Sequence, residues 1–277
     1  MQIEKRMRPM LGTFIEIGLA VDSQMHSAFD AAFFKIEQIQ SLMSFHNPKS
    51  ELSKINKHPY DWVQVSRQTV QVFRLAKQLS ERSQGLFNPT VGGELIERRV
   101  LPNHFTRPFE LKGSEKDIEI DGQNIRLNAP FLVTLDGIAK GYAVDQAVAK
   151  LRSLGVEHGW INAGGDIRVF GNLKLPVALR QQQTVDISEM PVCELQNQSI
   201  ASSHVGQPID ETFPGHILAT DNRKPTPALV SVVAKEAWLA DGLTKVFGLA
   251  NEEERENFAQ VFDVSYYHLP FELSTQS

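Results

Sequence analysis

The chain has 277 residues, of which 42% are hydrophobic and 22% are charged, a composition typical of a globular protein with an ample core. Its formal charge of −5 gives no support to general nucleic-acid binding, which needs a basic face, and no run reaches the ~18 apolar residues of a membrane helix. The single cysteine, Cys193, excludes a disulfide within the chain.

The first half of the chain shows apolar periodicities separated by turn residues and capping residues. β-Branched and aromatic residues indicate strands, and apolar side chains at helical spacing indicate helices. In chain order the predicted elements are a strand over 11–21, a helix over 22–44, a short helical turn over 50–56, a helix that begins at Ser66 and ends before Gly85, a turn-rich loop over 87–93, an irregular basic stretch over 97–116 and a hairpin over 118–127.

The second half continues with the same mixture of helices and strands. The predicted elements are a helix over 138–154, a strand, glycine turn and strand over 160–170, strands over 175–180, 192–202, 228–234 and 263–268, and helices over 236–249 and 252–260. Antiparallel strand pairs with interspersed helices favour an α+β fold over a doubly wound sheet. No internal repeat or clear linker is visible, so we expect a single domain over residues 1–277.

Two glycine-bearing turns flank the helix predicted over 138–154. Gly137 and Lys140 lie at its start, and Asn162-Ala163-Gly164-Gly165-Asp166 follows about twenty residues after Tyr142. Such turns bring backbone N–H groups close to a phosphate, and a lysine in the first turn is misplaced relative to the helix dipole unless an anion binds there. Together they indicate a site for a nucleotide pyrophosphate, although each turn alone could simply reverse the chain.

Asp241 is the one carboxylate in an apolar helical stretch, residues 238–247. Burial of a carboxylate without a partner is costly, so Asp241 must be capped, paired or bound to a metal. Lys245 is four residues later on the same helix face and could form an ion pair with it.

Taken together, these motifs resemble those of the FAD:protein FMN transferases, the ApbE-like family. Further matching segments are Leu11-Gly12-Thr13, Ser50–Asn56, Phe87–Gly92 and Leu239–Leu243, so the resemblance covers residues 8–250. It implies a compact α+β fold with mixed, largely antiparallel sheets and interspersed helices. It also implies an enzyme that binds FAD, uses Mg²⁺ and transfers FMN to a threonine hydroxyl of an acceptor flavoprotein, such as a membrane redox subunit, with release of AMP.

The resemblance also assigns roles to particular residues. Asp241 and His216 are the implied catalytic residues, with His216 as the proton acceptor, and the implied metal ligands are the Gly137 carbonyl, Asp241 and Thr244. The implied FAD contacts, including the glycine turn, are Leu11, His46, Leu86, Phe87, Asn88, Thr134, Lys140, Gly164, Gly165 and Leu218.

Lys245 departs from the family pattern, which often has a metal-binding threonine at this position. An ammonium about 4 Å from Mg²⁺ would repel it by roughly 8 kcal/mol at an effective dielectric constant of 20. Lys245 must therefore point away, with Thr244 completing the site on the same helix face, or it displaces the ion.

Other functions remain open from the sequence. With water in place of threonine, the same site would be an FAD pyrophosphatase that gives FMN and AMP. If Lys245 has displaced the metal, the chain could be a non-catalytic FAD-binding or flavin-storage protein, and the weakest alternative is an interaction domain without a ligand. The N-terminus lacks the apolar stretch of a secretory signal, which predicts a cytoplasmic protein, whereas a chain already freed of its leader would be periplasmic.

Overall fold

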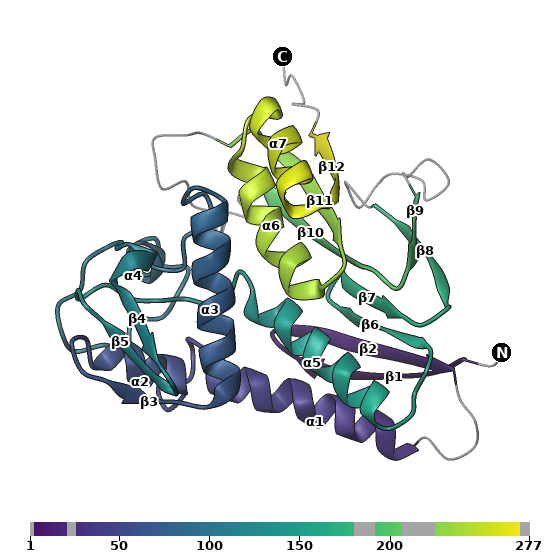
Figure 1. The fold of residues 1–277 in the computed structure, drawn as a ribbon, viewed down its shortest axis with the longest axis horizontal. Coiled ribbons are helices and arrows are strands. Elements are labelled where there is room, and N and C mark those ends of the chain that lie inside the picture. The colour runs from purple at the N-terminus through teal and green to yellow at the C-terminus, as the bar shows by residue number, and fades with distance from the viewer. Residues whose placement is uncertain (1–2, 21–25, 180–191, 207–224, 272–277) are drawn as a thin grey trace.

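The computed structural model describes residues 3–20, 26–179, 192–206 and 225–271, and these form three sheets with helices between them (Figure 1). The strand ladders are antiparallel, with one isolated parallel bridge between Val91 and Leu132. The predicted α+β class with antiparallel sheets is therefore confirmed.

Seven strands form the largest sheet. In spatial order they are β1 (Ile3–Met10), β2 (Thr13–Ala20), β6 (Gly159–Ala163), β7 (Asp166–Phe170), β10 (Ser199–Val205), β11 (Ala228–Ala234) and β12 (Ser265–Pro270). The three-stranded sheet has the order β3 (Val63–Gln64), β5 (Asn124–Leu127) and β4 (Ile118–Asp121), and the two-stranded sheet pairs β8 (Lys174–Ala178) with β9 (Val192–Gln196).

The helices separate the large sheet from the three-stranded sheet. They are α1 (His26–Met43), α2 (Glu51–Lys57), α3 (Arg67–Arg82), α4 (Gly92–Glu97), α5 (Ala139–Ser153), α6 (Ala237–Leu249) and α7 (Glu252–Phe262), with a short 3₁₀ turn, η1 (Glu115–Asp117). In Figure 1, α5 and α6 lie across one face of the large sheet, and α3 stands between them and the lobe made of α2, α4 and the three-stranded sheet.

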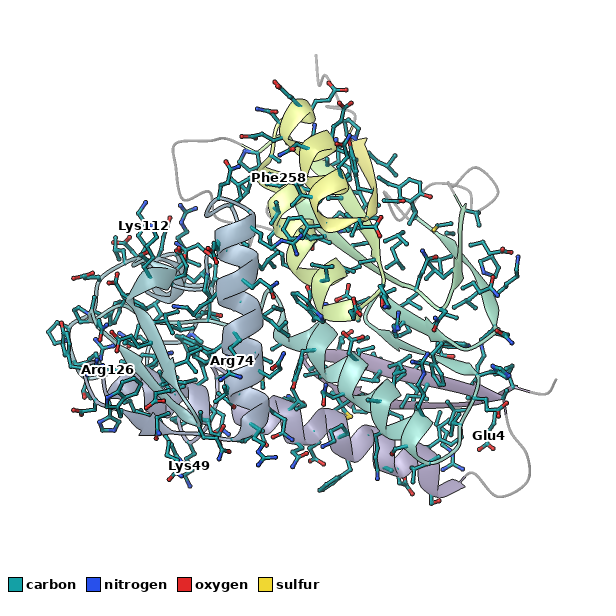
Figure 2. The ribbon with its side chains drawn as sticks, in the orientation of Figure 1. Glu4, Lys49, Arg74, Lys112, Arg126 and Phe258 are labelled. Atoms are coloured by element: carbon teal, nitrogen blue, oxygen red, sulfur yellow. The ribbon has the colours of Figure 1, made fainter. Side chains whose placement is uncertain are left out.

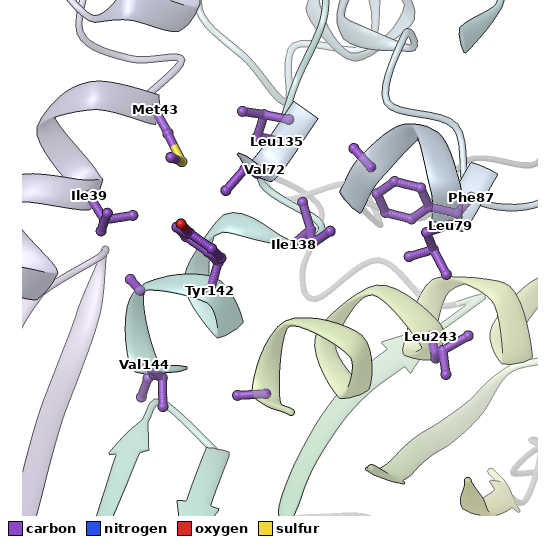
Figure 3. Packing of buried hydrophobic residues seen from close by; sticks show 14 of the residues in the cluster. Ile39, Met43, Val72, Leu79, Phe87, Leu135, Ile138, Tyr142, Val144 and Leu243 are labelled. Carbon is purple, nitrogen blue, oxygen red and sulfur yellow. The ribbon is translucent and has the colours of Figure 1, made fainter. Parts of the chain in front are cut away.

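The main core lies where α1, α3, α5 and α6 meet under the large sheet (Figure 3). Alternate residues of β2 (Ile15, Ile17 and Leu19) are fully buried, and Phe29 and Phe33 of α1 are buried at helical spacing. Charged residues such as Lys49 and Lys112 are exposed at the periphery (Figure 2). Within the described ranges, no helix has the length and apolar character needed to cross a bilayer.

Several local predictions are confirmed because they depend on nearby residues. Ser50 and Ser66 cap α2 and α3, and their side chains accept hydrogen bonds from the N–H groups of Ser53 and Thr69. The hairpin of β4 and β5 turns at Gly122, which has a φ of +56°. The helices predicted over 138–154, 236–249 and 252–260 correspond to α5, α6 and α7.

Two strand predictions were wrong in extent. The strand predicted over 11–21 begins at Thr13, because Leu11 and Gly12 form a two-residue turn with φ values of 55° and 70° that joins it to the unpredicted edge strand β1. The strand predicted over 192–202 is two strands in different sheets, because Asn197 has a φ of 52° and ends β9 before β10 begins.

A buried carboxylate of α5 fixes the start of α6. The side chain of Asp145 accepts hydrogen bonds from the N–H groups of Ala237 (3.0 Å) and Trp238 (2.9 Å), and Arg168 lies 3.8 Å away. Because its N-terminal N–H groups would otherwise be unpaired, α6 is anchored to α5 at this point. Burial raises the pKa of Asp145 to about 6, from an ordinary value of 3.8, although the two N–H groups and Arg168 act against this shift.

This shift predicts a pH dependence of stability. Between pH 3.8 and about 6 the folded state holds a proton on Asp145, whereas the unfolded chain has released it. The contribution of Asp145 to the free energy of unfolding is therefore most favourable below pH 3.8 and is lost as pH rises to about 6. The free energy of unfolding, taken relative to Asp145→Asn, should therefore fall by on the order of 3 kcal/mol over this window. Urea unfolding at several pH values measures it, and a difference that stays flat with pH would contradict the assignment. The exposed Asp30→Asn variant should follow the wild-type profile.

Candidate functional site

A cavity of about 480 Å³ lies where the loop after α3, the start of α5, β10 and α6 meet. This volume lies within the range of roughly 300–1,000 Å³ typical of small-molecule sites. The residues that line it are His46, Leu86, Phe87, Asn88, Pro89, Val91, Leu95, Val100, Leu101, Thr134, Asp136, Gly137, Lys140, Ser202, Ser203, His204, Lys245 and Leu249. Seven of the predicted site residues are among them: His46, Leu86, Phe87, Asn88, Thr134, Gly137 and Lys140.

The apolar wall is built by the loop that follows α3. Ser83 ends α3, and its hydroxyl accepts a hydrogen bond from the N–H of Phe87 (3.0 Å), which holds the loop against the helix end. Phe87 packs into the core close to Leu79 and Ile138 (Figure 3). The side chain of Asn88 turns the next residues by accepting hydrogen bonds from both the N–H and the hydroxyl of Thr90.

The start of α5 forms another part of the wall. The N-cap residue of α5 is Ile138, whose side chain cannot accept a hydrogen bond, so N–H groups of the first turn need other acceptors, and that of Ala139 donates to the carbonyl oxygen of Leu135 (2.8 Å). A Cβ atom at Gly141 would lie 2.3 Å from the carbonyl oxygen of Ala237, so only glycine allows α5 and α6 to approach this closely. The N–H of Gly141 then donates to Asp241 Oδ2 (3.2 Å).

Two lysines and two buried carboxylates form a charge cluster beneath the cavity: Lys140, Asp166, Asp241 and Lys245. Lys140 Nζ lies 2.8 Å from Asp166 Oδ2, and Lys245 Nζ lies 2.5 Å from Asp241 Oδ1. Asp166 and Asp241 are almost completely buried, whereas both lysines reach the cavity wall. Lys140 and Lys245 therefore line the cavity together with Asp136, whereas Asp166 and Asp241 are not among its lining residues.

The charges of the cluster influence one another. Burial alone would lower the pKa of Lys140, but the carboxylates of Asp166 and Asp241 outweigh it and raise the pKa above its ordinary value. Burial raises the pKa of Asp166, and the neighbouring Asp241 raises it further, against the opposing effect of the lysines. Lys140 is therefore a cation throughout the neutral pH range.

The side chains of two predicted metal ligands, Asp241 and Thr244, come together, but both already have partners. The Thr244 hydroxyl donates to the carbonyl oxygen of Asp241 (2.7 Å) and is hydrogen-bonded to the Ser203 hydroxyl (2.8 Å). The two carboxylate oxygens of Asp241 face Gly141 N–H and the Lys245 ammonium.

Lys245 decides whether these groups fit a divalent ion. It does not point away, because its ammonium contacts both Oδ1 (2.5 Å) and the carbonyl oxygen (2.9 Å) of Asp241. Its Cε also lies 3.7 Å from the position of a Cβ atom at Gly137, so the side chain occupies the space between two of the predicted ligands. Elsewhere in the described ranges, no group of three or more His, Cys, Asp or Glu side chains could hold a metal. As arranged here, the donor set does not fit Mg²⁺.

The glycine turn contributes to the cavity indirectly. Gly164 and Gly165 join β6 to β7 with φ values of 63° and 102°, and the Asn162 side chain accepts a hydrogen bond from the N–H of Gly165 (2.8 Å). The turn does not line the cavity itself but places Asp166 beside Lys140. Its predicted contact with FAD stays a prediction.

One further predicted contact, Leu11, is not in the cavity wall. Leu11 lies in the turn between β1 and β2, where its N–H donates to the side chain of Gln40 (3.2 Å). His216 and Leu218 lie outside the described residues.

Sequence reasoning missed the part of the wall that β10 supplies. Ser202, Ser203 and His204 all line the cavity. Ser202 is hydrogen-bonded to Ser231 of β11 (2.8 Å), and the His204 ring stacks on Phe271 with 5.6 Å between ring centroids. A run of three polar residues within an otherwise apolar strand was the available signal.

Comparisons with known proteins agree with this geometry. The sequence model of the ApbE family matches residues 11–267. A Vibrio cholerae protein named FAD:protein FMN transferase is 26% identical over 275 residues, which cover 88% of this chain and 80% of the relative. A Rhodobacter capsulatus protein of the same name is 34% identical over 110 residues, 35% of this chain and 20% of the relative.

Solved structures show the same fold. The flavinyl transferase ApbE of Pseudomonas stutzeri in its apo form superposes with a TM-score of 0.83 at 18% identity, over 98% of this chain and 92% of that one. The ApbE protein of Thermotoga maritima gives a TM-score of 0.83 at 23% identity, over 96% of this chain and 94% of that one. The predicted ApbE-like fold is confirmed.

Proposed function

The chain belongs to the ApbE family, and on that premise we propose that it moves the FMN half of FAD onto a threonine hydroxyl of an acceptor flavoprotein and releases AMP. The chain is a transferase, and its relatives from Vibrio cholerae and Rhodobacter capsulatus are named FAD:protein FMN transferase. One observation supports the choice of substrate: a single cavity joins an apolar wall, which includes Leu86 and Phe87, to the ammonium groups of Lys140 and Lys245.

The apolar and the basic residues of the lining match the two parts of such a substrate. The flat flavin ring would lie against Leu86 and Phe87 near His46, because apolar side chains favour an aromatic ring over water. The pyrophosphate would lie near Lys140, Lys245 and the start of α5, where positive charge and the helix dipole both favour an anion.

In the proposed reaction, the threonine oxygen of the acceptor attacks the phosphorus of the FMN half. A new P–O bond forms to threonine, and the P–O bond to the phosphate of AMP breaks. The threonine proton passes to a base, for which His216 was predicted, and AMP leaves with the negative charge of the broken bond. Lys140 and Lys245 are the cations that would offset this growing charge. Because the nucleophile belongs to the acceptor, the chain itself needs no nucleophilic residue.

The proposed reaction does not use the Mg²⁺ that the family resemblance implies. The ammonium of Lys245 binds one carboxylate oxygen of Asp241, and the N–H of Gly141 binds the other. In the proposed reaction, side chains of the protein therefore supply all of the positive charge.

The proposal is tested by following FAD, AMP and flavin together. FAD at about 100 times its Kd should stabilise the protein by about 2.7 kcal/mol. With an acceptor flavoprotein, chromatography should detect AMP, and an equal amount of flavin should stay on the acceptor after denaturation. Equal amounts of AMP and free FMN, with no acceptor-bound flavin, would identify an FAD pyrophosphatase instead. Absence of any stabilisation by FAD would contradict both activities.

A further inference from the structure

Lys245 reaches back over one turn of α6 to the carboxylate that precedes it. Lysine–carboxylate pairs at this spacing are common on exposed helix faces, where they contribute little. Here the Asp241 carboxylate is only 2% exposed and the Lys245 side chain only 24% exposed. The pair is thus largely removed from solvent, and its lysine lines the cavity.

The ammonium of Lys245 makes the contacts that a bound cation would make. It lies within hydrogen-bonding distance of Oδ1 and of the backbone carbonyl oxygen of Asp241, and its Cε approaches Gly137. The remaining oxygen atoms are held by neighbours, since Gly141 N–H donates to Oδ2 and Ser203 bonds to Thr244. The polar atoms of Asp241 and Thr244 are thus satisfied without an additional ion.

The charges are also balanced without a metal. Lys140 offsets Asp166, and Lys245 offsets Asp241, in two close ion pairs. A divalent ion placed beside Asp241 would add two positive charges to a site where one ammonium already neutralises the carboxylate. Conversely, removal of Lys245 would leave Asp241 with an unpaired buried charge that a cation could compensate.

We propose that Lys245 is the resident cation of this site, replacing a divalent metal, so that the protein binds the FAD pyrophosphate without Mg²⁺. This role rests on the proposed FAD site and assigns to one side chain the charge that a metal would supply there. The ammonium of Lys245 faces the phosphates from one side of the cavity, and that of Lys140 faces them from the start of α5.

The test compares wild type with two variants, Lys245→Thr, which adds a hard oxygen in place of the charge, and Lys245→Met, which removes the charge and adds none. FAD affinity is measured by fluorescence titration in EDTA and again with saturating Mg²⁺, after thermal unfolding has shown that each variant is folded. We expect the wild-type Kd to change by less than about twofold between the two conditions. Lys245→Thr should bind FAD at least about tenfold more weakly in EDTA and recover with Mg²⁺, whereas Lys245→Met should stay weak in both.

Two outcomes would overturn the role of Lys245 while leaving the FAD site intact. One is wild-type binding that appears only with Mg²⁺, and the other is unchanged affinity of Lys245→Thr in EDTA. Mg²⁺ titration without FAD gives an independent measurement, because Lys245→Thr should bind the ion more tightly than wild type does. If wild type binds FAD in neither condition, the proposed function itself fails, and that result is distinct from the other two.

Discussion

Replacing Asp241 by asparagine should reduce AMP release from FAD by at least about tenfold, a loss of ~1.4 kcal/mol in transition-state stabilisation. The amide keeps the volume of the side chain but removes the charge that holds the Lys245 ammonium at Oδ1. A lysine that is no longer held in place stabilises the departing AMP less well. FAD affinity should be unchanged or tighter, because one negative charge is removed from beneath the phosphates.

Separate measurements of Kd and of AMP release distinguish this positioning role from a general loss of structure. The matched control is Asp30→Asn, the same chemical change at an exposed position of α1, which should leave both quantities at wild-type values. Retention of more than about a tenth of the wild-type rate in Asp241→Asn would rule out the positioning role. Loss of FAD affinity in parallel with the rate would point instead to collapse of the contact between α5 and α6.

Replacing Lys140 by alanine should weaken FAD binding by about tenfold to a hundredfold and leave riboflavin binding nearly unchanged. A hydrogen bond to a charged group contributes about 1.5–3 kcal/mol, and riboflavin has no phosphate with which to form one. Paired titrations with the two ligands measure the ratio of affinities. Equal weakening of both would mean that Lys140 acts on the fold or on the flavin ring.

The same variant should also lose stability, because Asp166 keeps its buried position without its ion-pair partner. Breaking a fully buried pair costs about 3–5 kcal/mol, and less is expected here because the Lys140 side chain is 31% exposed. The pKa of Asp166 is already raised by burial, so uptake of a proton limits the loss further. Lys174→Ala, which removes from β8 an exposed partner of Glu194 on β9, is the control and should change neither stability nor affinity measurably.

Helix starts and tight turns depend on local sequence. Helix starts at Ser50 and Ser66 and the hairpin at Gly122 were predicted correctly, because capping and turn formation involve residues only two or three apart. The edge strand β1 was missed, because its mixture of charged and apolar residues shows no buried face, and none of its residues is fully buried even when it pairs with β2.

Some residues of the candidate site could be predicted from local sequence, and others could not. Helical spacing alone put Asp241, Thr244 and Lys245 on one face of α6, and the glycine turns with Lys140 indicated a phosphate site before any fold was known. Ser202, Ser203 and His204 gave too weak a signal, since their approach to the cavity depends on the pairing of β10 with β11 and on its packing against α6. The Gly164–Gly165 turn was expected to contact FAD, yet in the structure its visible effect is to place Asp166 beside Lys140.

The sequence by itself determined most of the helices, the family resemblance and the two possible positions of Lys245, because these follow from residue type and short spacing. Only the tertiary structure decided between those positions. The contact of Gly141 with Asp241 joins residues 100 positions apart, and it requires α5 and α6 to pack closely enough that only glycine fits between them. That packing leaves one oxygen of the buried carboxylate for Lys245, and the low polarity of the interior makes pairing with the nearest ammonium far more favourable than leaving the charge alone.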